Sequence, residues 1–155
     1  MNLEVKDRVR DILCYTRKPI DEFYYDPKLA YSMHLALGGE GGFQALNHNS
    51  GVLFARATEN EDGSLNAKSI RSPYLFVMKD GTYGVMAVRV DGDGGEDPES
   101  IGKVLFFTSR DLLEYNEEGL LSLCEGAVDQ VVCHYDPGKG KYELCWCQSD
   151  RQWYR

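Results

Sequence analysis

The sequence predicts an all-β protein. It contains ten Tyr, six Phe and two Trp beside sixteen Gly and only five Pro, and this composition favours short strands joined by glycine turns over a helical bundle. The clearest local pattern lies in residues 72–89, where two runs of β-branched, aromatic and aliphatic residues flank Asp80 and Gly81. An Asp-Gly pair between such runs predicts a β-hairpin, because glycine accepts the positive φ of a tight turn. At 155 residues the chain suits one domain with its own core.

The part of the chain before this hairpin contains further strand patterns. Residues 4–14 carry apolar side chains at helical spacing, so a short helix competes there with a strand that ends at residues 15–17. Residues 29–37 predict a buried strand, which ends at the glycines of residues 38–42. These glycines indicate a tight turn and not a phosphate-binding loop, because neither a Lys-Ser/Thr pair nor a helix follows them. We expect the next strand at residues 51–57.

Within and after the hairpin, glycine and proline mark the strand boundaries. We expect Pro73 to open the first strand of the hairpin and Gly84 to mark a bulge or a close backbone approach. Residues 91–100 are rich in Asp and Gly, but adjacent glycines and flanking strands favour a solvated hairpin loop over a calcium-binding loop. The remaining strands are expected at residues 104–109, 119–123 and 131–147, the last range being a second hairpin.

The net charge argues against two classes of partner. The chain carries 25 acidic and 17 basic residues, which gives a net charge of −8, and its Lys and Arg residues form no dense cluster. Nucleic acids and anionic membranes are therefore poor candidates as partners. The sequence has no apolar run of the roughly 18 residues that a membrane-spanning helix needs and no apolar stretch of a signal peptide, so we expect a soluble, cytoplasmic protein.

The cysteine pattern favours free thiols. Five cysteines leave one unpaired in any full disulfide scheme, which fits a reducing compartment. Cys145 and Cys147 share one face of a predicted strand, so a metal site would need Cys124 and Cys133 as further ligands. Because this spacing matches no zinc motif, we expect neither a bound metal nor a cofactor.

A loose repeat runs through the chain. In each copy an apolar strand ends in a small residue, a turn carries an acid or glycine, and an aromatic residue or leucine follows; the copies cover residues 32–43, 105–115 and 142–153. Repeated antiparallel units of this size suggest blades of a β-propeller. We therefore expect about three propeller-like antiparallel blades that form an incomplete ring.

Several phrases of the sequence resemble the family 43 glycoside hydrolases. They are Tyr-Ser-Met-His-Leu-Ala at residues 31–36, Ser-Pro-Tyr-Leu-Phe at 72–76 with Asp-Gly-Thr-Tyr-Gly-Val-Met-Ala-Val-Arg at 80–89, and Phe-Thr-Ser-Arg-Asp-Leu-Leu at 107–113. The resemblance extends over most of residues 15–154. It implies a five-bladed propeller that hydrolyses terminal arabinofuranosyl or xylosyl linkages with inversion of the anomeric configuration. Its partner would be an oligosaccharide or glycoside. Three blades do not close such a ring, so residues 1–155 are expected to be a single propeller-like domain that forms a homo-oligomer, or the N-terminal part of a longer propeller.

The resemblance also implies catalytic residues. Asp26, before Pro27, matches the position of the family's water-activating base, and Asp129 is the candidate for its second, pKa-tuning Asp. An inverting pair of carboxyl groups stands roughly 6.5–9.5 Å apart, but no Glu of this chain matches the family's general acid. The alternative is therefore a module that binds glycans, or serves in assembly, without catalysis.

Four further residues are candidates for sugar contact. His34 lies in an apolar strand, where a buried structural histidine is the usual outcome. Arg89 could clamp a carboxylate or a ring hydroxyl, although a structural ion pair is the common role. Tyr74 and Trp146 could stack on sugar rings, but aromatic side chains of short strands are usually part of a core.

Overall fold

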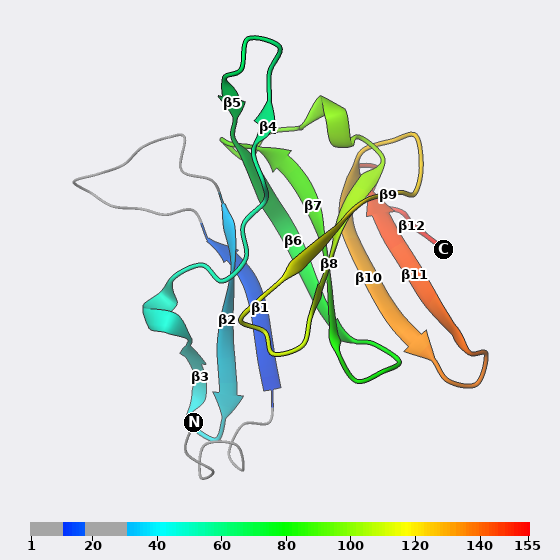
Figure 1. The fold of residues 1–155 in the computed structure, drawn as a ribbon. Helices are drawn as coiled ribbons and strands as arrows, with labels where there is room; N and C mark the ends of the chain where they lie inside the picture. The colour runs from blue at the N-terminus through cyan, green and yellow to red at the C-terminus, as the bar shows by residue number, and fades with distance from the viewer. Residues whose placement is uncertain (1–10, 18–30) are drawn as a thin grey trace.

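A computed structural model describes residues 11–17 and 31–155, which form twelve strands and two short 3-10 helices. The described strands pair as several antiparallel sheets, none of which closes into a barrel (Figure 1). The architecture confirms the predicted all-β class and is consistent with an incomplete, propeller-like arrangement.

The first sheet has the order β1 (Asp11–Arg17), β2 (Ser32–Gly39) and β3 (Gly42–Ala45). Of the two alternatives at the N-terminus, the strand is the one observed for residues 11–17. The predicted glycine turn connects β2 to β3, and Gly42 has a φ of +95°.

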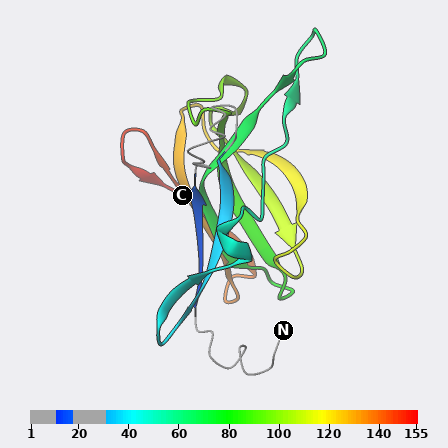
Figure 2. The same ribbon diagram turned by 90° about the vertical axis from the view of Figure 1, so that its left-hand side faces the viewer.

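The segment after the first sheet differs from the prediction. The 3-10 helix η1 (Asn47–Asn49) is followed by residues 51–57, which were expected to form a strand but make only an isolated bridge between Leu53 and Met33. Backbone hydrogen bonds from Met33 N to Leu53 O at 2.9 Å and from Val52 N to Met33 O at 2.8 Å hold this segment against β2 at that one point. A small hairpin, β4 (Thr58–Glu59) with β5 (Leu65–Asn66), then extends away from the sheets (Figure 2).

The central sheet contains the predicted hairpin. Its order is β6 (Lys68–Val77), β7 (Tyr83–Asp91), β8 (Lys103–Ser109) and β9 (Asn116–Ser122). The turn after β6 closes as expected, with Gly81 at a φ of +83°. Pro73 does not open β6, which begins five residues earlier; instead the register shifts between Arg71 and Tyr74, and Ser72 has a φ of 50°. A proline is tolerated at such a bulge because the local ladder is already interrupted.

Gly84 allows a close approach between its own backbone and the ring of Phe76, as expected for a glycine within a strand. A Cβ atom there would lie 2.4 Å from Cζ of the Phe76 side chain. The ring of Phe76 therefore packs directly on the backbone of the neighbouring strand, and any larger residue at position 84 would displace it.

The last sheet has the order β10 (Val128–Asp136), β11 (Lys141–Gln148) and β12 (Trp153–Tyr154). The hairpin of β10 and β11 is the second hairpin of the prediction. Its register is interrupted between Val128 and Gln130, which leaves Asp129 at a bulge.

Both faces of the central sheet are buried. Alternate residues of β7 face opposite sides: Val85 and Ala87 pack with the first sheet, whereas Met86, Val88 and Val90 pack with the last sheet. Because successive side chains of a strand point to opposite faces, burial on both sides explains why β7 reads as a nearly continuous apolar run. The central sheet is thus the shared wall of two cores, and a cavity lies at the edge of the second one.

Candidate functional site

The cavity lies between the central sheet and the last sheet. Its volume is about 180 Å³. Its polar lining comes from three parts of the chain: Arg71 and Arg89 from the central sheet, Glu96, Asp97 and Ser100 at the 3-10 helix η2 (Pro98–Ser100), and Asp129 and Ser149 from β10 and the turn after β11. Valine and isoleucine side chains supply the apolar lining, namely Val88, Val90, Ile101 and Val128.

An ion pair joins the two sheets beside this cavity. Arg71 Nη2 lies 3.1 Å from Asp129 Oδ1, and the two side chains are 46% and 43% exposed. Both residues stand at the bulges described above, which interrupt β6 and β10. A bulge adds a residue to one strand and turns side chains away from the regular alternation. These irregularities therefore place two oppositely charged groups together from positions 58 residues apart.

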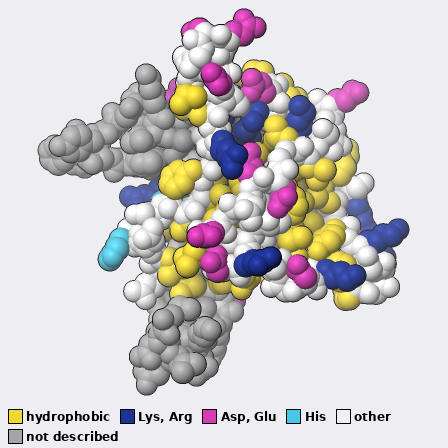
Figure 3. All heavy atoms as spheres, in the orientation of Figure 1, with side chains coloured by type: hydrophobic (Ala, Val, Ile, Leu, Met, Phe, Trp, Pro, Cys, Tyr) yellow, Lys and Arg dark blue, Asp and Glu magenta, His cyan; other side chains and the backbone are white. Residues whose placement is uncertain are grey.

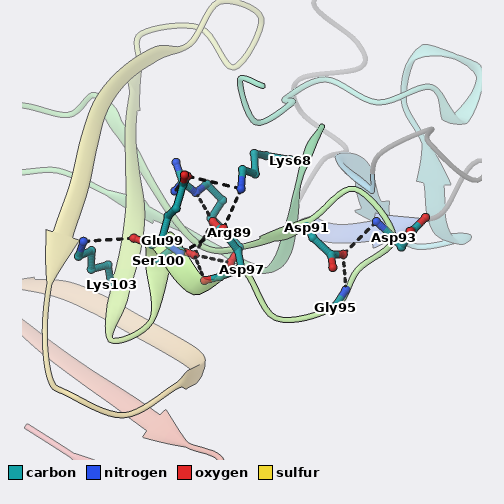
Figure 4. A network of polar contacts seen from close by, with 9 residues as sticks. All are labelled: Lys68, Arg89, Asp91, Asp93, Gly95, Asp97, Glu99, Ser100 and Lys103. Atoms are coloured by element: carbon teal, nitrogen blue, oxygen red, sulfur yellow. Dashed lines mark hydrogen bonds and ion pairs between the residues drawn. The ribbon is translucent and has the colours of Figure 1, made fainter. Parts of the chain in front are cut away.

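A second polar cluster forms one wall of the cavity (Figure 4). The carboxylate of Asp97, whose side chain is fully buried, accepts a hydrogen bond from Lys68 Nζ at 2.7 Å and one from Arg89 Nε at 2.7 Å. Ser100 Oγ donates to the same carboxylate at 2.8 Å. Two cations and a hydroxyl group thus satisfy a carboxylate that would otherwise be costly to bury.

These contacts keep Asp97 ionised. Burial acts to raise the pKa of Asp97, but the hydrogen bonds from Lys68, Ser100 and Arg89 outweigh it and hold the pKa at about 2. A carboxyl group with this pKa carries no proton to donate at neutral pH. Asp97 is therefore a buried anion whose oxygens are directed at Lys68, Arg89 and Ser100.

The acidic loop at residues 91–95 is held by hydrogen bonds between its own residues. Asp91 Oδ1 accepts hydrogen bonds from the backbone N–H groups of Asp93 at 3.0 Å and Gly95 at 2.6 Å (Figure 4). The prediction of a solvated hairpin loop at residues 91–100 is thus only partly correct, because Asp97 and Ser100 are buried. No group of three or more His, Cys, Asp or Glu residues that could hold a metal occurs in the described ranges, 11–17 and 31–155.

The cavity brings together two of the six predicted site residues, Asp129 and Arg89. Asp26 lies outside the described residues. His34 is buried in β2, where its Nε2 lies 3.1 Å from Ser32 Oγ and its ring stacks on Tyr15 at 5.4 Å.

Tyr74 and Trp146 also lie away from the cavity. Both pack against the core between the central and last sheets, and Trp146 stacks on Tyr154 with 6.1 Å between ring centroids. The indole Nε1 of Trp146 is buried and has no hydrogen-bond partner in the part of the chain that the structure describes. Neither these two aromatic residues nor His34 lines the cavity.

Sequence reasoning missed Arg71, Lys68 and Asp97. Asp97 carried a usable signal, because Asp before Pro98 and Glu99 is the pattern of a helix N-cap followed by proline in the first turn, and its side chain does accept a hydrogen bond from Glu99 N at 3.3 Å. The role of Arg71 had no local signal, since its partner lies in another sheet.

Comparisons with known proteins found no relative of this chain. No protein-family model, curated protein or solved structure matches the chain. Among the described residues, none of the helices has the length and apolar character needed to cross a membrane.

Proposed function

We propose that this protein binds neutral glycans and holds one sugar unit in the cavity that Arg71 and Asp129 line. The observation that carries the proposal is the Arg71–Asp129 pair, which two bulges place beside a small cavity with an apolar lining. A guanidinium group donates hydrogen bonds and a carboxylate accepts them. Neighbouring hydroxyl groups of a sugar can do both, so such a pair complements them.

The size and charge of the site support a neutral, single-unit ligand. A volume of about 180 Å³ is below the roughly 300–1,000 Å³ of pockets for drug-sized ligands. Acidic and basic side chains alternate over the face shown in Figure 3, without a large field of one sign that would favour a polyanion. The valine and isoleucine side chains of the lining can bury the C–H face of a sugar ring away from water.

Binding without hydrolysis is the preferred form of this proposal. Three acidic residues line the cavity among the described residues, namely Glu96, Asp97 and Asp129. Asp97 remains ionised, and Asp129 is paired with Arg71. Asp26, the expected base, lies outside the described residues, so the sequence resemblance is the support for hydrolysis of arabinofuranosyl or xylosyl linkages.

Titration with methyl α-L-arabinofuranoside and methyl β-D-xyloside, followed by amide NMR shifts, tests the proposal. We expect saturable binding, with a Kd about tenfold weaker in Arg71→Ala and in Asp129→Ala, because each change removes one charge-assisted hydrogen bond. Arg151→Ala, an exposed arginine outside the cavity, is the matched control and should bind as the native chain does. The absence of saturable binding by the native chain would overturn the proposal. Release of aryl alcohol from aryl glycosides would restore the hydrolase hypothesis.

A further inference from the structure

We propose that protonation of His34 releases the turn at residues 47–51 from the first sheet, so that this turn is a pH-dependent cover over the imidazole ring. Neither the turn nor His34 lines the cavity, and the inference is independent of the proposed function. It rests on two observations. His34 has a buried ring nitrogen without a hydrogen-bond partner in the described residues, and three successive residues of the turn have a left-handed backbone.

His34 lies on the face of the first sheet that points away from the central sheet. Its neighbours in β2, Met33 and Leu35, belong to the core shared with the central sheet, and successive side chains of a strand point to opposite faces. The ring is nevertheless only 5% exposed. Tyr15, the register partner of His34 in β1, stacks on it, and Asn49 of the turn lies close to it. The burial of His34 therefore depends in part on the turn.

Hydrogen bonds outside the strand ladders hold the turn against the sheet. Tyr15 Oη donates to Asn49 Oδ1 at 2.7 Å, and directly after the turn the backbone N–H of Val52 donates to Met33 O at 2.8 Å. Neither bond belongs to the ladders that join β1, β2 and β3. The turn can thus open while the first sheet stays paired.

The backbone of the turn favours its release. Asn47, His48 and Asn49 have φ values of 50°, 52° and 61°. Asn and His accept this left-handed conformation more readily than most residues, but usually as single residues and not in succession. A run of three stores free energy that an open turn does not retain. The closed turn is therefore less stable than its hydrogen bonds alone would make it.

The closed turn does not accommodate a proton on His34. Its Nε2 lies 3.1 Å from Ser32 Oγ, whereas Nδ1 is buried without a hydrogen-bond partner in the described part of the chain. The groups that face the ring are Tyr15 and Arg17 of β1, Ser32 of β2 and Asn49 of the turn, and none of these supplies a negative charge. Burial lowers the pKa of His34 and Arg17 adds to this effect, against the opposing groups of Asn49. A protonated ring therefore favours the open turn, where water can solvate it.

Amide hydrogen exchange of the full chain tests the inference, with each rate divided by the intrinsic rate of an unstructured chain at the same pH. An exposed His has a pKa of about 6.5, so the population of the open turn should rise by up to about tenfold between pH 7.5 and pH 5.5. We expect the protection of the Val52 and Leu53 amides, which both donate to Met33 O, to fall by several-fold to about tenfold. Exchange through a local opening does not depend on low concentrations of urea, whereas exchange through global unfolding does.

The chain contains three His residues, and a variant of each assigns the effect. His34→Phe keeps an aromatic ring beside Tyr15 but cannot be protonated, so the pH dependence of Val52 protection should disappear. His48→Asn and His134→Gln replace exposed residues and should keep it; Asn also tolerates the left-handed backbone at position 48. If His34→Phe does not fold, an NMR titration of the His34 ring in the native chain replaces it, and its midpoint should coincide with that of the Val52 change.

Three results would overturn the inference. They are protection of Val52 that does not change with pH in the native chain, a pH dependence that persists in His34→Phe or has a midpoint different from that of the His34 ring, and exchange at pH 5.5 that accelerates with low urea. Loss of the pH dependence in His48→Asn would likewise overturn it, because the effect would then belong to the exposed imidazole of the turn.

Discussion

Replacement of Asp97 by Asn should be the most damaging isosteric change in the protein. The amide keeps the shape of the carboxylate but loses its charge, and one of its two ends becomes a donor. Lys68 Nζ and Arg89 Nε, which approach the two carboxylate oxygens at 2.7 Å each, cannot then both be satisfied. Two cationic groups are then left in the cluster with the largely exposed carboxylate of Glu99 as their remaining counter-ion.

Two independent arguments set the size of the effect. The fall in the pKa of Asp97 from 3.8 to about 2 corresponds to about 2 kcal/mol, at about 1.36 kcal/mol for each unit of pKa. Removal of one partner from a buried ion pair typically costs about 3–5 kcal/mol. We therefore expect Asp97→Asn to lower the free energy of unfolding by about 2–5 kcal/mol, out of a total of about 5–15 kcal/mol for an ordinary domain.

Urea unfolding at pH 7 measures this loss, with Asp129→Asn as the comparison. Asp129 also pairs with an arginine, but both side chains of that pair are nearly half exposed, so its stability should fall by less than about 1 kcal/mol. A loss in Asp97→Asn no larger than that in Asp129→Asn would show that the buried cluster contributes little to stability.

The pH dependence gives a second check of the same reasoning. Because the pKa of Asp97 is lowered by folding, its stabilisation is present above the unfolded pKa of 3.8 and is lost as the pH falls towards 2. Asp97→Asn lacks this titration. The difference in unfolding free energy between the native chain and the variant should therefore shrink between pH 4 and pH 2, and a constant difference would contradict the assigned pKa.

Two further predictions concern Gly102 and His34. Gly102 has a φ of +70°, and a Cβ atom there would lie 1.9 Å from the carbonyl oxygen of Cys124, so Gly102→Ala should cost about 3 kcal/mol or more in urea unfolding. Gly81→Ala is the control, since Gly81 has a φ of +83° but no atom within 4 Å of the added carbon; equal losses would show that backbone strain and not the clash is responsible. Burial lowers the pKa of His34, with a further contribution from Arg17, although nearby Asn49 groups oppose the shift. The folded state thus resists protonation of His34, and the free energy of unfolding should fall below about pH 6.5 by at most about 1.4 kcal/mol per pH unit. This pH dependence should disappear in His34→Phe. An unchanged pH dependence in the variant would exclude His34 as its source.

Local signals account for the parts of the fold that the sequence predicted. The hairpin around Gly81 and the one formed by β10 and β11 each combine apolar runs with a glycine-containing turn, and the structure has both. The strand expected at residues 51–57 was wrong because an apolar run indicates burial without providing a partner strand, and Leu53 pairs at one point only. Pro73 was misplaced as a strand start because the bulge that tolerates it depends on the register with β7.

The residues of the candidate site were harder to predict than the hairpins, because their contacts join parts of the chain that are far apart in the sequence. Arg89 was named for the hydrogen bonds that a guanidinium group can donate and Asp129 from the family resemblance. Both line the cavity, but their partners Asp97 and Arg71 follow from tertiary contacts. Lys68 is the clearest case, because a lysine at the start of a strand would ordinarily be exposed, whereas its ammonium group is buried against Asp97.

The two bulges connect the fold to the proposed function. Arg71 pairs in register with Val88, which packs towards the last sheet, so the regular alternation of β6 already directs the Arg71 side chain to that face. The register shift between Val128 and Gln130 leaves Asp129 outside the regular ladder of β10, where its carboxylate pairs with Arg71. An exposed ion pair of this kind adds little to stability, and a bulge costs ladder hydrogen bonds. Together the two irregularities are poorly explained by folding alone, whereas paired donors and acceptors at the mouth of a small cavity are what a sugar-binding site requires.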